Sequence, residues 1–120
     1  MRYLMLLSGT NPATPPPPAL FEAIIKLGGE ATAAGVLLDT AGLLPSQAGA
    51  RVALAGGKVT VTDGPFTESK ELISYALYDL RSRDEAIEWA SRFVRLHRDL
   101  WPGWQGQTDI LQVMGPDNGG

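Results

Sequence analysis

Hydrophobic and polar positions in the first third of the chain predict a strand, a loop, a helix and a second strand. Residues 2–7 (RYLMLL) are apolar on both alternating faces, which is typical of a strand covered on both sides. Residues 8–18 contain five prolines and therefore predict an extended surface loop. From Ala19 the apolar spacing is helical up to Gly35, which is placed as a C-terminal cap, and residues 36–38 resume as a short strand.

The middle of the chain predicts a loop followed by a hairpin. Residues 41–50 (AGLLPSQAGA) have no regular period and contain turn-forming residues. The alternating residues 51–54 and 59–62 then flank Gly56 and Gly57, a pair that strongly indicates a tight turn between antiparallel strands.

The last third predicts a strand, a helix and a final strand. Residues 72–80 (LISYALYDL) are apolar on both faces, and residues 108–114 (TDILQVM) form a shorter strand-like run. Between them, Ser82 and Glu85 have the spacing of a capping box, in which each side chain binds a free backbone N–H group. The helix that begins there is expected to end near Arg98.

This order of elements predicts one α+β domain over residues 1–120, with a flexible tail at 115–120. A strand, helix and strand are followed by a hairpin, a strand, a helix and a strand, which is the plan of a ferredoxin-like sheet with two helices on one face. Because the strands at 2–7 and 72–80 are apolar on both faces, the uncovered face needs a partner. We therefore expect a second copy of the chain to cover it and form a homodimer.

A stiff corner follows the hairpin at Asp63-Gly64-Pro65, and Phe66 supplies an aromatic anchor beside it. The Asp63 carboxylate is expected to accept backbone N–H groups of the turn, and Pro65 restricts the backbone. Such a corner either holds a site or joins two strands.

Composition narrows the classes of function. The formal net charge of −3 gives no basic field for nucleic acid. The absence of cysteine excludes disulfides and thiol nucleophiles and fits a reducing compartment. No apolar run approaches the roughly 18 residues of a membrane span, so we expect a cytoplasmic protein without a membrane partner. A single histidine and the lack of a nucleotide-binding loop predict no tightly bound metal or organic cofactor.

Several segments together resemble the YCII-related proteins of the DGPF type. These segments are YLMLL near the start, AAGVLLDTAGLLP from Ala33, GARV, GGKVTVTDGPFTESKELI, DEAIEWA and LHRDLWPGWQG from Leu96. The resemblance covers nearly the whole chain. It implies a dimeric α+β barrel in which two ferredoxin-like sheets face each other. It also implies a sigma-factor-like regulator as a partner, because such regulators are frequently paired with DGPF proteins.

The chain departs from the family pattern at three points. The wider YCII relatives have a proposed His/Asp pocket, but the first helix expected here contains no histidine. DGPF relatives usually carry Gly-Gly where this chain has Ser74, and an arginine in the last strand where it has Leu111. The missing arginine removes a contact for an anion.

Few residues combine reactive chemistry with a fixed position. Asp63 is the best acid/base candidate, because a backbone corner holds it. His97 matches a family LH pair and is either functional or a helix C-terminal cap. Trp101 and Trp104 form either an aromatic wall for a ligand or part of the core. The predicted pocket comprises Asp63, Phe66, Glu68, Lys70, His97, Trp101 and Asp109.

Three functions fit these observations. The first is a small-ligand-binding or regulatory accessory protein, which the missing histidine and arginine favour. The alternative is a small-molecule enzyme that uses Asp63 as an acid/base in a pocket at the dimeric barrel. A purely structural role is the third.

Overall fold

The computed structural model describes residues 1–66 and 70–115, and its helices and strands follow the predicted order. Their bounds are β1 (Arg2–Thr10), α1 (Pro18–Ala33), β2 (Leu37–Gly42), η1 (Ser46–Ala48), β3 (Ala50–Ala55), β4 (Lys58–Asp63), β5 (Glu71–Asp79), α2 (Arg83–Leu100) and β6 (Gln105–Gln112).

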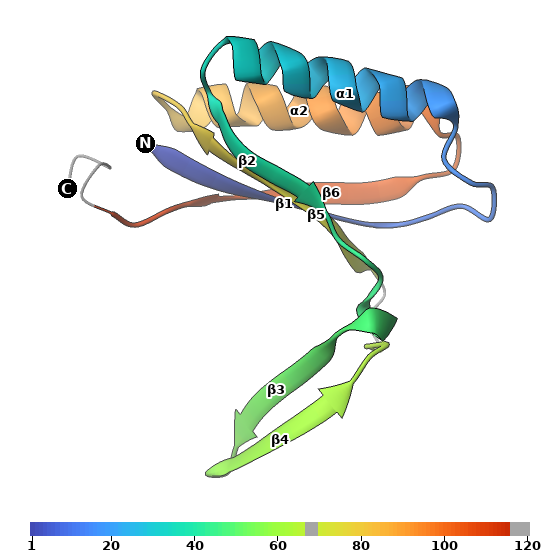
Figure 1. The fold of residues 1–120 in the computed structure, drawn as a ribbon, viewed down its shortest axis with the longest axis vertical. Coiled ribbons are helices and arrows are strands. Elements are labelled where there is room, and N and C mark those ends of the chain that lie inside the picture. The colour runs from blue at the N-terminus through green and yellow to red at the C-terminus, as the bar shows by residue number, and fades with distance from the viewer. Residues whose placement is uncertain (67–69, 116–120) are drawn as a thin grey trace.

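Four strands form an antiparallel sheet in the order β2-β5-β1-β6. Figure 1 shows α1 and α2 side by side on one face of this sheet. Without the inserted β3–β4 hairpin the order is β-α-β-β-α-β, so the predicted ferredoxin-like α+β fold is confirmed. We call the face away from the helices the open face.

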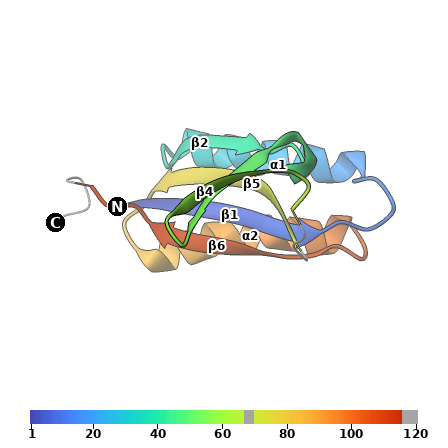
Figure 2. The same ribbon diagram turned by 90° about the horizontal axis from the view of Figure 1, so that it is seen from below.

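The strands β3 and β4 form a separate two-stranded hairpin, which we call the arm. Its turn is the predicted one, because Gly56 and Gly57 have φ values of 57° and 75°, a region that suits glycine. Every residue of both strands is exposed. Figures 1 and 2 show the arm extending from the sheet on the side opposite the helices.

The residues predicted to end α1 and to begin α2 do so in the structure. Gly35, at φ 74°, follows the last turn of α1. Ser82 Oγ accepts a hydrogen bond from Glu85 N at 3.2 Å and caps α2. The Glu85 carboxylate accepts from Arg81 N at 3.0 Å, one residue before the position expected for a capping box. Neither helix in the described part of the chain is long and apolar enough to cross a membrane.

The core lies between the helices and the sheet in two clusters. The larger contains Tyr3, Met5, Ala31, Tyr78, Leu80, Ala86 and Ala90, and the smaller contains Leu7, Leu20, Trp101 and Trp104. The Trp104 indole fits only because Gly9 and Gly106, which face each other on β1 and β6, lack side chains. A Cβ at these two positions would lie 2.6 Å and 2.2 Å from Trp104 ring atoms.

Several boundaries differ from the prediction. The strand β2 extends to Gly42, into the segment predicted as a loop, because its residues pair with β5. Pairing also explains why β6 begins earlier than the predicted residue 108. The strand β1 continues to Thr10, which pairs with Gln105. The proline-rich loop is correspondingly shorter, and Pro18 begins α1. Residues 116–120 of the predicted tail lie outside the described residues.

Candidate functional site

An apolar band crosses the middle of the open face. Because Tyr3, Met5 and Leu7 are buried beneath the helices, the alternate residues of β1 point to the open face. The register places the side chains of β5 and β6 beside them. The band consists of Leu4, Leu6, Tyr75, Leu77 and Leu111. It includes Leu111, 51% exposed, where the family resemblance implies an arginine.

One polar pair lies at the β2 side of this band. The Tyr75 hydroxyl donates to Asp39 Oδ2 at 2.9 Å. This hydrogen bond and the charge of Asp39 raise the pKa of Tyr75 above its ordinary value. The phenol therefore stays protonated at neutral pH, and it acts as a donor and not as a base.

A second polar group lies on the β6 side. The Lys70 ammonium donates to Gln107 Oε1 at 3.1 Å, and Gln107 Nε2 donates to Asp109 Oδ1 at 3.2 Å. Asp109 stands opposite Leu6, on the other side of β1 from Tyr75. Two predicted site residues, Lys70 and Asp109, are thus joined through Gln107. The alternation of β6 places Gln107 on the same face as Asp109, but the strand predicted at residues 108–114 begins one residue after Gln107 and so did not include it.

The base of the arm holds two other predicted residues. Asp63 ends β4, and Phe66 N donates to Ser46 Oγ at 3.1 Å. The Arg51 guanidinium lies 4.1 Å from the Phe66 ring centroid, a cation–π arrangement. Within residues 1–66 and 70–115 no hydrogen bond reaches the Asp63 carboxylate, and Phe66 N, a backbone donor of the corner, binds Ser46 Oγ.

Ser46 is the centre of the arm base. Its backbone N–H and its hydroxyl both donate to Glu71 Oε1 at 2.9 Å. Gly64 N donates to Gly49 O at 2.9 Å, and the Gly64-Pro65 peptide bond is cis. A Cβ on Gly64 would lie 1.6 Å from Ser46 O, so only glycine fits there. The corner therefore fixes the direction in which the arm leaves the sheet.

The remaining predicted residues are not part of the open face. His97 is buried, 4% exposed, with its Nδ1 3.0 Å from Phe93 O and its ring 4.6 Å from that of Trp104. Burial lowers the pKa of His97, which favours the neutral ring, and in that form Nδ1–H donates to Phe93 O. Trp101 Nε1 donates to Thr14 O and Trp104 Nε1 donates to Asn11 Oδ1, so both tryptophans pack in the core and hold the proline-rich loop. Glu68 lies outside the described residues.

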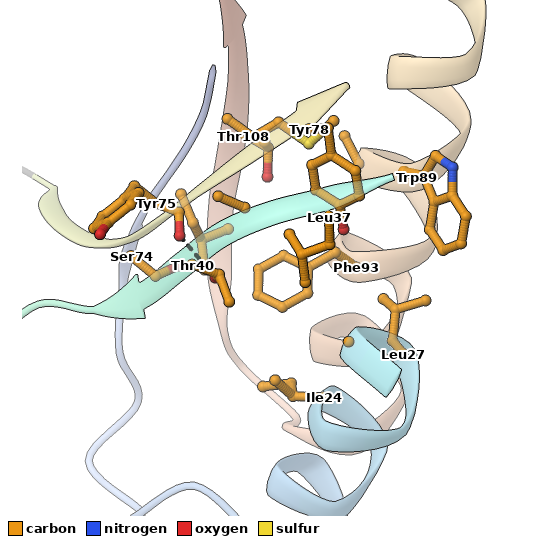
Figure 3. A pocket seen from close by; sticks show the side chains of 15 residues that line it. Ile24, Leu27, Leu37, Thr40, Ser74, Tyr75, Tyr78, Trp89, Phe93 and Thr108 are labelled. Carbon is orange, nitrogen blue, oxygen red and sulfur yellow. Dashed lines mark hydrogen bonds between the residues drawn. The ribbon is translucent and has the colours of Figure 1, made fainter. Parts of the chain in front are cut away.

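A small cavity lies between the helices and the sheet. Its volume is about 80 Å³. Figure 3 shows Ile24, Leu27 and Phe93 on the helix side, and Ser74 and Thr108 on the sheet side. Thr108 Oγ1 is buried there without a hydrogen-bond partner among the described residues. Ser74, where the resemblance implies a glycine, therefore faces this cavity and not the open face.

The described residues contain no group of three His, Cys, Asp or Glu side chains that could hold a metal ion. The family model of the YCII-related domain matches residues 1–97, and the chain therefore belongs to this family. No curated protein matches the sequence.

Proposed function

Because the chain belongs to the YCII-related family and its sheet has an uncovered apolar face, we propose that it is a homodimer that binds a small ligand between two facing sheets. The observation that carries this proposal is the apolar band on the open face. A contiguous apolar patch is typical of an interaction surface. A second copy suits it, since a two-fold axis brings the same patch of both subunits together. The dimer would be an α+β barrel of the DGPF type.

The polar groups beside the band indicate the ligand class. Asp39 and Tyr75 lie at one side, and Lys70, Gln107 and Asp109 lie at the other. They suit a small molecule with an apolar body and hydrogen-bonding groups at its ends. Binding fits these groups better than acid/base chemistry, because the carboxylates of Asp39 and Asp109 are already held by donors. This supports a ligand-binding accessory protein.

The enzyme alternative depends on Asp63. This residue is exposed, and no hydrogen bond within the described residues joins it to Lys70 or Asp109. An acid/base role predicts that Asp63→Asn loses turnover as fully as Asp63→Ala, because an amide does not take the proton. The binding proposal predicts that ligand affinity survives in the Asn variant.

Sedimentation velocity over a concentration series tests the dimer. Leu6→Lys places a charge at the centre of the band, opposite Asp109, where the single subunit can accommodate it. In a dimer this charge is buried twice, and we expect the dissociation constant to rise at least about a hundredfold. Ile25→Lys, at a 73% exposed position on the outer side of α1, is the matched control and should leave dimerisation unchanged. A wild-type monomer at micromolar concentration would contradict the proposal.

The fluorescent probe 8-anilinonaphthalene-1-sulfonate tests the ligand space, since it brightens in apolar sites. The wild-type dimer should bind it saturably, and the Leu6→Lys monomer should lose that saturable site. A dimer without such a site would show that the two sheets pack without space for a ligand.

A further inference from the structure

The arm has one apolar and one polar face. Its register pairs Val52 with Val61 and Leu54 with Val59, so these four side chains share a face. They are between 64% and 72% exposed. The opposite face carries Arg51, Ala53, Lys58, Thr60 and Thr62.

A hairpin of this kind is not stable by itself. Two strands alone are marginal in water, and they need a further strand or a packed layer against the apolar face. The strong alternation of valine, leucine and threonine indicates that one face is covered when the protein is assembled. Within residues 1–66 and 70–115 the four apolar side chains remain exposed, so the described part of the chain does not cover them.

The base of the arm holds it in a defined direction. Ser46 is bonded to both Glu71 and Phe66, and Gly64 fits directly against the Ser46 carbonyl. These contacts tie the end of the arm to the first residue of β5 and therefore to the main sheet. An apolar hairpin that is fixed so that it projects from its own domain is suited to meet another molecule.

The position of the arm points to a second copy as that molecule. The arm and the open face are both on the side of the sheet away from the helices (Figures 1 and 2). A copy seated on the open face therefore also lies beside the arm. Two-fold symmetry then gives each subunit an arm from the other, so that one arrangement covers both arms and both open faces.

We propose that each arm reaches across the dimer and packs its face of Val52, Leu54, Val59 and Val61 on the partner subunit, where it closes one side of the ligand space. This inference rests on the proposed dimer. It assigns the Asp63-Gly64-Pro65-Phe66 corner a positioning role, since the corner directs the arm toward the partner.

Sedimentation equilibrium with two neighbouring substitutions tests this proposal. Val61→Lys and Thr60→Lys introduce the same charge on the same strand, but on opposite faces of the arm. We expect Val61→Lys to raise the dissociation constant at least tenfold and Thr60→Lys to change it less than twofold. Circular dichroism checks that both variants remain folded.

The outcomes distinguish a failure of the arm contact from a failure of the proposed dimer. If the wild type is dimeric and the two lysine variants have equal dissociation constants, the arm does not pack on the partner. The proposed homodimer is then still supported. If the wild type is monomeric, the dimer and the arm contact both fail. Should Val61→Lys not fold, hydrogen exchange on the wild type decides: the amides of β3 and β4 should lose protection when the protein is diluted below its dissociation constant. Protection that is independent of concentration would overturn the proposal.

Discussion

Replacing Gly64 by alanine should detach the base of the arm and leave the four-stranded sheet intact. The new Cβ would lie 1.6 Å from Ser46 O and 2.4 Å from Ser46 C. These are backbone atoms, so no side-chain rotation relieves the overlap. Either η1 or the corner must move, and either movement breaks the hydrogen bonds that join Ser46 to Glu71 and Phe66.

The expected cost follows from these contacts. Overpacking by one methyl group typically costs about 1–3 kcal/mol, and a clash with backbone belongs at the upper end. The broken hydrogen bonds contribute about 1 kcal/mol each, but relief of the overlap offsets part of their loss. We therefore expect the free energy needed to open the arm base to fall by about 3 kcal/mol. That value corresponds to roughly a hundredfold change in the opening equilibrium.

Amide hydrogen exchange measures this opening directly. In Gly64→Ala the amides of Ser46 and Phe66 should exchange about a hundred times faster than in the wild type. Gly49→Ala is the matched control, because its Cβ would meet the same carbonyl at 3.5 Å, an ordinary contact, and its φ of −113° suits alanine. It should change exchange less than about threefold. Equal exchange in the two variants would refute the close approach of Gly64 to Ser46.

Three other predictions concern the helix layer and the core. Thr108→Val removes a buried hydroxyl without a partner among the described residues and should raise the free energy of unfolding in urea by about 1 kcal/mol; a decrease would indicate that water binds the hydroxyl. Gly28→Ala should stabilise α1 by about 0.5–1 kcal/mol in the same assay, because no atom beyond the adjacent helix backbone lies within 4 Å of the new Cβ, and a loss would contradict this open space. Burial lowers the pKa of His97 in the fold, so its contribution to stability is complete above the unfolded value of about 6.5 and is lost as the pH falls toward the folded value. Melting temperatures between pH 7 and pH 5 should therefore fall less in His97→Gln, which keeps a donor for Phe93 O, than in the wild type, and parallel curves would exclude this role.

The spacing of apolar residues was sufficient to predict the fold, because a helix layer and a sheet each require their own spacing along the chain. The apolar run of β1 and the Gly56-Gly57 turn are local signals, and the structure follows both. Strand ends were predicted less well, because they depend on the partner strand. Residues 39–42 of β2, which follow the strand predicted at 36–38, have no strand-like pattern of their own and become part of the strand by pairing with β5.

The candidate site was only partly predictable, for a related reason. Lys70 and Asp109 were expected together, and their connection through Gln107 requires only that β5 and β6 flank β1. The contribution of Ser46 could not be predicted, because it joins residues that are far apart in sequence through a loop without periodicity. Trp101 and His97 were ambiguous from residue type alone, since an aromatic side chain suits a pocket wall and a core equally well.

The glycines show which features can be predicted from local sequence and which cannot. The turn glycines at 56 and 57 have positive φ, a requirement that a turn pattern predicts. Gly64 and Gly106 are required for a different reason, namely the close approach of Ser46 and of the Trp104 ring. Such an approach is set by the packing of distant segments, so no local pattern identifies it. The same distinction applies to the corner at Asp63-Gly64-Pro65-Phe66. Its residues resemble an ordinary turn in sequence, but Gly64 is needed because η1 packs against it. This packing sets the direction of the arm.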